Sequence, residues 1–474
     1  GLMLDWMRFV SDQVLDFYQA EIEPLRAITP DVPITTNFMR PDVGLDYWAF
    51  APQVDVISWD SYPRWHGEMD DVSVAVETAF YHDLHRSFKQ RPFLLMESTP
   101  SVTNWQGISR PKRPGMHQLA SLQAVAHGSN SVQYFQWRQS RGGSEKFHGA
   151  VVSHAGSENS RTFQEVTAVG DLLAQLDSVV NSINHAEVAL IYDFQNEWAL
   201  NLAELPRNVD KNYQERCMAH YRPFWQRGIT VDIINSTFAD LSAYKLVIAP
   251  MLYMLQPGVA ENLSAFVAAG GTLVTTYLTG LVDQRDLVFL GGAPGPLKPL
   301  LGLEVEETDV LFDHHTQSVR FKNGVITLEA YGYSVKQYAD IIHLHKAKAI
   351  AAYEQDFYAG TPALTVNKVG TGKAYYVAAR PDVDFLADFY GWLAEGLGVK
   401  TAVSQPLPIG VTAQVRTTEK EVFIFLLNFN DVDTMIRLDE TTYHDALSGQ
   451  TVDPDITLPA YGFRVFVTPR SSTF

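Results

Sequence analysis

Short runs of apolar residues that stop at a polar side chain constrain the fold of this chain more than any other feature. The clearest run covers residues 93–96, Phe-Leu-Leu-Met, and is followed directly by Glu97. A continuous apolar run of this length is typical of a strand that is buried on both faces, as in a parallel sheet. A carboxyl group at the end of such a strand loses solvation energy unless it is paired or has a function.

Further runs of this kind lie within the first 180 residues, and segments with helical periodicity separate them. Strands that alternate with helices indicate βα units, and four strands after an opening helix predict the second half of a (β/α)8 TIM barrel, strands five to eight. Chemistry in such barrels lies at the carboxyl ends of the strands, although an open doubly wound sheet would present its strand ends in the same way. The side chains at the expected strand ends are Asn37, Asp60, Tyr62, Glu97, Trp137 and Arg138.

The rest of the chain shows two further patterns. Between residues 181 and 400, apolar runs such as "EVALIYDF" and "YKLVIAP" alternate with helix-like segments, which predicts a flavodoxin-like α/β domain. Residues 401–474 alternate between apolar and polar side chains, which predicts a small all-β domain. With residues 1–180 as the barrel half, the chain is expected to have three domains, a number that suits its 474 residues.

Charge and cysteine content exclude several kinds of protein. The formal net charge is −18, whereas a nucleic-acid partner requires a positive surface. Cys217 is the single cysteine, so no disulfide and no cysteine-based zinc cage can form within the chain. It lies in a helix-like segment and not in a nucleophile elbow, which disfavours an amidotransferase function for the middle domain. No apolar run is long enough to span a bilayer, and the cysteine usage favours the cytoplasm.

Glu97 is the first candidate for chemistry. A carboxyl group in this position fits a salt bridge to an arginine, or a cap for the following turn, as well as it fits a function. The expected place at the barrel mouth favours a function. Tyr62, Trp105 and Trp137 are expected at the same face, where aromatic rings serve as platforms for the apolar face of a sugar; burial in the core is the alternative for them.

The loop after the last barrel strand, "QWRQSRGGSEKFHGAVVSH", is rich in polar side chains. Glu145 and His148 in this loop could hydrogen-bond a polyhydroxyl ligand. Metal binding is a weaker interpretation, because one glutamate and one histidine on a loop do not make a ligand set, and a solvated charged loop is the third. From the residues alone, a polyhydroxyl site and a solvated charged loop both stay open, and no metal and no other cofactor is expected.

Several segments of the chain resemble the β-galactosidases of glycoside hydrolase family 42. The most specific match is "MESTPSVTNWQ", and the resemblance extends over the barrel half, the middle domain and the β domain. The other similar segments are "GLMLDWMRFVSDQ", "PITTNFM", "DVISWDSYP", "QWRQSRGGSEKFHGAVVSH" and "LPAYGFRVF".

The resemblance implies a retaining hydrolase of terminal, non-reducing β-D-galactosyl residues, with Glu97 as the nucleophile that forms a covalent galactosyl-enzyme. It also implies a homotrimer in which the middle domain takes part in assembly. Three residues match positions that line the galactose subsite of the family, namely Trp105, Glu145 and His148. The residues expected there from their places at the strand ends are Asn37, Asp60, Tyr62 and Trp137.

One catalytic group of the family has no match. A retaining glycosidase needs a second carboxyl group as acid and base, and in the family it is a glutamate at the end of barrel strand four. We therefore expect this chain to be the C-terminal portion of a longer enzyme, without the N-terminal barrel half and inactive alone. The alternatives are a related exo-glycosidase, an α-L-arabinopyranosidase or a β-D-fucosidase, and a non-catalytic sugar-binding or assembly fragment.

Overall fold

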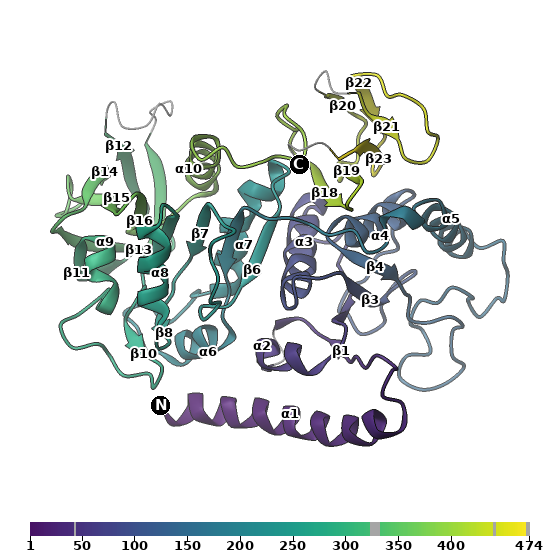
Figure 1. The fold of residues 1–474 in the computed structure, drawn as a ribbon, viewed down its shortest axis with the longest axis horizontal. Helices are drawn as coiled ribbons and strands as arrows, with labels where there is room; N and C mark the ends of the chain where they lie inside the picture. The colour runs from purple at the N-terminus through teal and green to yellow at the C-terminus, as the bar shows by residue number, and fades with distance from the viewer. Residues whose placement is uncertain (42–43, 323–331, 439–441, 471–474) are drawn as a thin grey trace.

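Residues 1–41, 44–322, 332–438 and 442–470 are described by a computed structural model, in which two lobes stand side by side on a long N-terminal helix (Figure 1). The helix, α1 (Leu2–Ile28), runs beneath both lobes. Among the described residues, no helix has both the length and the apolar composition that crossing a bilayer requires.

The first lobe contains a four-stranded parallel sheet whose strands follow one another in chain order. This confirms the four predicted strands and their direction, while their place in half of a closed barrel stays a prediction. The strands are β1 (Asn37–Phe38), β2 (Ser58–Ser61), β3 (Phe93–Ser98) and β4 (Ser129–Val132), and the helices are α2 (Tyr47–Phe50), α3 (Asp71–Ser87), α4 (Met116–Ala126) and α5 (Arg161–Gln175).

The last strand of this sheet differs from the prediction. The apolar and aromatic run predicts a strand that ends at Trp137, but β4 ends at Val132. The pairing between β3 and β4 shifts register after Phe93, and beyond Val132 only single backbone bonds continue, such as Phe135 N–H to the Ser98 carbonyl at 3.1 Å. Trp137 therefore lies in a loop and does not close a strand.

The second lobe is built on a large mixed sheet. Its parallel part has the order β6-β5-β7-β9-β16, which in chain order is 2-1-3-4-5, so the flavodoxin-like prediction is confirmed for this part. These strands are β5 (Val188–Ile191), β6 (Val231–Ile234), β7 (Leu246–Ala249), β9 (Thr272–Thr276) and β16 (Gly372–Val377), and the main helices are α6 (Phe194–Leu202), α7 (Tyr213–Gln226), α8 (Val259–Ala268) and α10 (Val383–Gly396).

An antiparallel extension of the same sheet was not predicted. From β16 the sheet continues with the order β15-β14-β12-β13-β11. Exposed charged side chains interrupt some of these strands, such as Glu306 and Glu307 in β11 and Arg320 in β12, so the continuous apolar run that marks a parallel strand is missing there. The strands are β11 (Leu303–Val310), β12 (Gln317–Phe321), β13 (Tyr333–Leu344), β14 (Lys348–Tyr353) and β15 (Pro362–Val369).

The C-terminal residues form antiparallel strands, as predicted for an all-β segment. The order in the main sheet is β18-β19-β23-β21, and β20 pairs with β22. Strand β19 packs on helix α4 of the first lobe. The strands are β18 (Val411–Thr417), β19 (Glu421–Asn428), β20 (Thr434–Arg437), β21 (His444–Asp445), β22 (Asp455–Leu458) and β23 (Phe463–Pro469).

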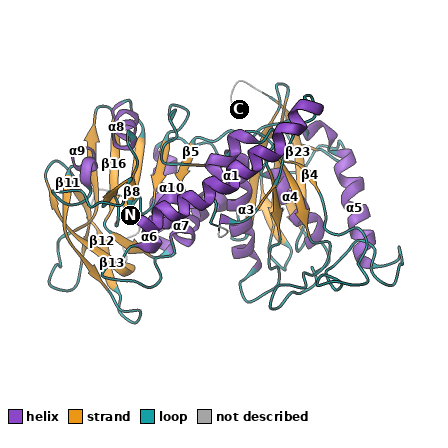
Figure 2. Cartoon of the chain, turned by 90° about the horizontal axis from the view of Figure 1, so that it is seen from below, coloured by secondary structure: helices purple, strands orange, loops and turns teal. Residues whose placement is uncertain are grey.

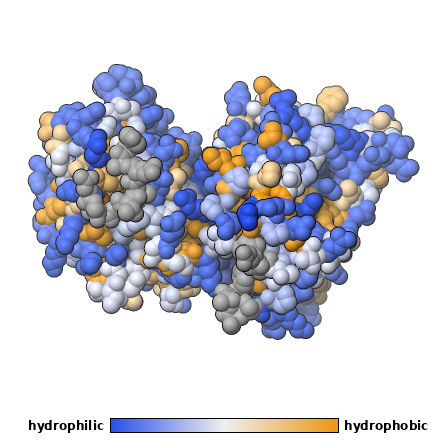
Figure 3. All heavy atoms as spheres, turned by 90° about the horizontal axis from the view of Figure 1, so that it is seen from above, coloured by the Kyte–Doolittle hydropathy of each residue, from blue (hydrophilic) through white to orange (hydrophobic). Residues whose placement is uncertain are grey.

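Helix α1 bridges the lobes from below (Figure 2). Arg8 donates through Nε to Gln195 Oε1 of the second lobe at 2.9 Å, and Ser11 Oγ accepts from the backbone N–H of Asp46 in the first lobe at 3.0 Å. Seen from above, the two lobes are separated by a notch and the surface is mostly hydrophilic (Figure 3). The outer face of α1 carries the exposed apolar side chains Leu2, Met3, Trp6, Phe9, Phe17, Leu25 and Ile28.

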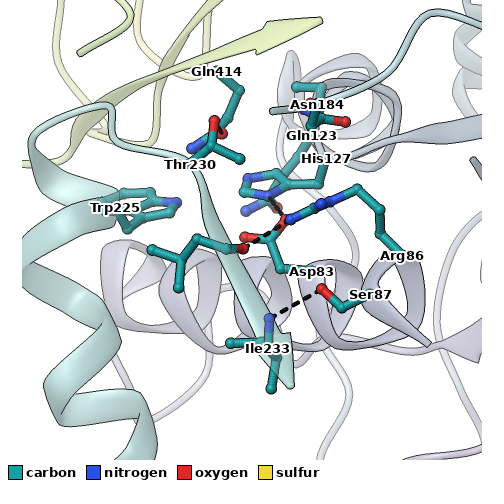
Figure 4. Close-up of polar contacts among 12 residues, drawn as sticks. Asp83, Arg86, Ser87, Gln123, His127, Asn184, Trp225, Thr230, Ile233 and Gln414 are labelled. Atoms are coloured by element: carbon teal, nitrogen blue, oxygen red, sulfur yellow. Dashed lines mark hydrogen bonds and ion pairs between the residues drawn. The ribbon is translucent and has the colours of Figure 1, made fainter. Parts of the chain in front are cut away.

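A buried ion cluster joins the lobes at their centre (Figure 4). Arg86 of α3 donates through Nη1 to Asp232 Oδ1 of β6 at 2.6 Å and through Nη2 to Asp83 Oδ1 at 3.2 Å. Asp83 also accepts from Tyr221 Oη at 2.6 Å and contacts His127 Nδ1 at 2.9 Å. Since these side chains are buried, each charge depends on its partners for the solvation that water would otherwise supply.

A second buried arginine fastens the C-terminal strands to the first lobe. Arg416 of β18 donates to the carbonyl oxygens of Val125, Ser129 and Ser182, each at 2.8 Å, and to Asn130 Oδ1 at 2.9 Å. Burial lowers the pKa of its guanidinium to about 9. The three parts of the chain are therefore held together by charged groups as well as by apolar packing.

We predict that Arg86→Met lowers the free energy of unfolding by about 3–5 kcal/mol, because it leaves the buried carboxylates of Asp83 and Asp232 without their cation. Chemical denaturation at pH 7 measures this loss. Arg161→Met is the matched control: it breaks the exposed ion pair with Glu165, 2.7 Å long, and should cost less than about 0.5 kcal/mol. Equal losses in the two variants would contradict the role of the buried cluster.

Candidate active site

The parallel register brings three polar side chains to one edge of the first sheet. Asp60 of β2 lies directly opposite Glu97 of β3, and Asn37 of β1 lies opposite Ser58 of β2. Because the carboxyl ends of parallel strands meet at the same edge, residues far apart in the sequence become neighbours there. The structure therefore brings together the predicted strand-end residues of β1, β2 and β3.

Both carboxyl oxygens of Glu97 accept a hydrogen bond. Asn37 donates through Nδ2 to Oε1 at 3.2 Å, and Tyr62 donates through Oη to Oε2 at 2.6 Å. Burial and the charge of Glu97 raise the pKa of Tyr62 far above its ordinary value, so the phenol remains a donor at all ordinary pH values. Hydrogen bonds of this kind stabilise a carboxylate and fix the direction in which its oxygens point.

Asp60 lies deeper than Glu97, with 8% of its surface exposed. Its two oxygens accept from Asn37 Nδ2 at 2.9 and 3.1 Å. Burial raises the pKa of Asp60 to about 6; the hydrogen bond from Asn37 opposes the shift and the charge of Glu97 adds to it. The Asp60 carboxyl group thus faces another side chain, and its predicted contact with a sugar stays a prediction.

Aromatic rings stand beside Glu97. The rings of Tyr62 and Trp105 meet edge to face with centroids 5.3 Å apart, and Trp105 is 54% exposed. The loop that carries Trp105 is braced against the strand end, since Gln106 Nε2 donates to the Tyr62 carbonyl at 3.1 Å. An exposed indole that is held next to a carboxylate offers the kind of surface on which the apolar face of a sugar packs.

His148 is fully buried, and among the described residues neither of its ring nitrogens has a hydrogen-bond partner. Its ring lies between those of Tyr62 and Phe135, at centroid distances of 5.9 and 5.1 Å. Burial lowers the pKa of His148, while the charge of Glu145, the nearby backbone of Phe135 and the charge of Glu97 oppose that shift. A buried polar group without a partner is costly, and such groups are typical of sites that complete their hydrogen bonds with a ligand.

The loop that holds His148 packs tightly onto the loop that holds Trp105. A Cβ atom at Gly149 would lie 2.7 Å from the backbone nitrogen of Val102, so only glycine allows the approach. Asn104 Nδ2 ties the two loops with a bond of 2.6 Å to the Ser144 carbonyl. The sequence did not predict a role in the site for Gln106, Asn104 or Gly149. Their contacts join loops that are distant in the chain, and no local pattern indicates how such loops lie relative to each other.

Two further predicted residues, Glu145 and Trp137, differ in how they relate to this group of side chains. Glu145 lies near enough for its charge to act on Tyr62 and His148, and its carbonyl accepts from the His148 N–H at 2.9 Å. Trp137 is 66% exposed, and within the described part of the chain its ring has no aromatic contact with this group. Across the same described residues, no three side chains of His, Cys, Asp or Glu gather as metal ligands.

Three family models match consecutive parts of the chain. The model "Beta-galactosidase" matches residues 1–176, "Beta-galactosidase trimerisation domain" matches residues 186–400, and "Beta-galactosidase C-terminal domain" matches residues 410–468. Together they span the two lobes and the C-terminal strands described above.

Two relatives are closely similar over almost the whole of this chain. The β-galactosidase Pbg of Clostridium perfringens is 50% identical over 469 residues, and the β-galactosidase BglY of Alicyclobacillus acidocaldarius is 50% identical over 469 residues. The matches cover 98% and 99% of this chain and 68% of each relative.

Solved structures agree with these matches. The β-galactosidase from Rahnella sp. R3 superposes with a TM-score of 0.95 at 49% identity, over 98% of this chain and 68% of that one. The chain thus spans about two thirds of the length of these relatives, and the expected absence of an N-terminal barrel half stays a prediction. The sequence resemblance is confirmed: the chain belongs to the β-galactosidases of glycoside hydrolase family 42.

Proposed function

We propose that this chain carries the nucleophile and part of the sugar site of a retaining exo-β-galactosidase. The strongest support comes from the surroundings of Glu97. Each of its carboxyl oxygens accepts a hydrogen bond from a different side chain, Asn37 or Tyr62, at a strand end beside the exposed indole of Trp105. A nucleophilic carboxylate has to point at the carbon that it attacks, and the two donors fix the direction of its oxygens. Galactosides are the proposed substrates because the relatives at 50% identity are named β-galactosidases.

In the proposed reaction, a carboxylate oxygen of Glu97 attacks the anomeric carbon of a terminal β-D-galactosyl residue. The bond to the leaving oxygen breaks as a galactosyl ester of Glu97 forms, and water later hydrolyses that ester with overall retention. Trp105 would pack against the sugar, and the unpartnered nitrogens of His148, with the Glu145 carboxylate, would bond its hydroxyl groups. Asn37, Asp60 and Tyr62 would act mainly through the carboxylate that they surround.

The proton for the leaving group requires a second carboxyl group. Asp60 shares a hydrogen-bond donor with Glu97, but it is buried and both of its oxygens face Asn37, so we do not assign it this role. As the family resemblance implies, we propose that the acid–base glutamate is not among these 474 residues. A substrate whose leaving group needs no proton therefore tests Glu97 separately from the acid.

We also propose three domains, over residues 1–180, 181–400 and 401–474, and assembly as a homotrimer. Support for the trimer comes from the match of residues 186–400 to a trimerisation-domain model. A cytoplasmic location is proposed from the single cysteine, Cys217, which is a free and buried thiol.

We predict that the chain releases dinitrophenolate from 2,4-dinitrophenyl β-D-galactoside and that Glu97→Gln lowers this release at least about 1,000-fold, since the amide cannot replace the carboxylate as nucleophile. Absorbance measured under single-turnover conditions follows the step. Glu158→Gln, at an exposed glutamate in the loop before α5, is the matched control and should keep the rate of the parent chain. Release that survives in Glu97→Gln would show that another group attacks the sugar.

We predict that the chain assembles into a particle of three times its 53.0 kDa mass. Light scattering during size-exclusion chromatography at micromolar concentration measures the mass directly. A particle of single-chain mass throughout the concentration range would contradict assembly through the middle domain.

A further inference from the structure

Asp60 and Glu97 bind the same amide group. Asn37 Nδ2 lies 2.9 and 3.1 Å from the two oxygens of Asp60 and 3.2 Å from Oε1 of Glu97. The nitrogen has two hydrogens, so one can serve Asp60 while the other serves Glu97. The three side chains come from β1, β2 and β3, and this one amide links all three strands at their carboxyl ends.

The amide of an asparagine can turn over and exchange its N–H₂ and C=O ends. With the amide carbonyl toward Glu97, two hydrogen-bond acceptors, Asn37 Oδ1 and Glu97 Oε1, would face each other. Glu97 would then lose a donor. Asp60 forbids that orientation, because its own carboxylate also accepts only N–H donors. Asp60, on the buried side of Asn37, is thus an acceptor that selects the N–H₂ end of the amide.

We propose that Asp60 is a positioning residue: it fixes the orientation of the Asn37 amide so that an N–H group, and never the carbonyl, points at Glu97. The consequence for catalysis rests on the proposed function of Glu97, whereas the orientation itself does not. Asp60 touches no sugar atom in this role and acts through Asn37 alone.

The charge of Asp60 fits such a role better than a purely structural one. Among the described residues, the titratable groups that interact with it are Glu97 of the neighbouring strand and Tyr62, which directly follows its own strand, and neither is a cation. Burial raises its pKa to about 6, so keeping it ionised above that pH costs folding stability. An uncharged residue would avoid this cost, and costs of this kind concentrate at functional sites.

The orientation is tested by NMR on the full chain with 15N-labelled asparagine side chains, with Asn37→Ala to assign the signals. We expect the Asn37 amide signals to titrate near pH 6 in the parent chain, to titrate at a lower pH in Glu97→Gln because the charge of Glu97 is gone, and to lose the titration in Asp60→Asn. A titration that survives in Asp60→Asn, or that disappears only in Glu97→Gln, would overturn the proposal.

The effect on the reaction is tested by a double-mutant cycle on dinitrophenolate release. Asp60→Asn should slow release about 10- to 100-fold, the loss expected for one hydrogen bond to a charged group. In the background of Asn37→Ala the same change should have no further effect. Equal losses in both backgrounds would overturn the role through Asn37. If the parent chain releases no dinitrophenolate while the NMR result holds, the proposed function fails and the positioning stands.

Folding of Asp60→Asn has its own control. Folding raises the pKa of the Asp60 carboxyl group to about 6. The stability that the protonated group contributes is therefore fully present below the pKa of the unfolded chain and is lost as the pH rises through about 6. Asparagine does not ionise, and the gain in melting temperature of the variant over the parent should therefore be larger at pH 8 than at pH 4. A loss of the same size at both pH values would show that Asp60 is not a buried carboxylate in the folded chain.

Discussion

The buried ion cluster around Arg86 is the interaction on which the rest of the structure depends. Arg86 lies on α3, the helix that follows β2, and it bonds Asp232 on β6, the edge strand at the parallel end of the other lobe's sheet. Helix α3 also packs on β2 and on α7, so a shift of the cluster would move the strand that carries Asp60. The carboxyl edge of the first sheet therefore takes its position from charges that lie at the junction of the lobes.

Chemistry at that edge follows from parallel pairing. The register that sets Asp60 opposite Glu97 forces two carboxyl groups into one neighbourhood, which would be unfavourable without a shared donor. Asn37 supplies that donor and Tyr62 supplies a second one, so that Glu97 is held at both oxygens. The burial of Asp60 and the lack of partners for the ring nitrogens of His148 both lower the stability of the fold. A ligand site would explain why the chain retains these two residues.

The sequence predicted those parts of the fold that depend on short, local patterns of residues. Buried strands read as apolar runs, so the ends of β1, β2 and β3, with Asn37, Asp60 and Glu97, could be predicted. The predicted position of Trp137 at the end of a strand was wrong. The register between β3 and β4 shifts and regular pairing of β4 stops at Val132, which the amino-acid composition of this segment does not indicate. The antiparallel strands between residues 303 and 369 were missed, since exposed charged side chains interrupt the apolar runs of some of them. Contacts between distant segments, such as Arg86 with Asp232 or Gly149 with Val102, have no local signature at all.

The identity of the group that attacks the sugar is the central claim, and peptide mapping tests it most directly. The chain is treated with 2,4-dinitrophenyl 2-deoxy-2-fluoro-β-D-galactoside, whose fluorine slows hydrolysis of the ester, and is then digested and analysed by tandem mass spectrometry. We expect a single fluorogalactosyl group on Glu97. A label on another carboxyl group, Asp60 or Glu145 for example, would contradict the account, and so would the complete absence of label.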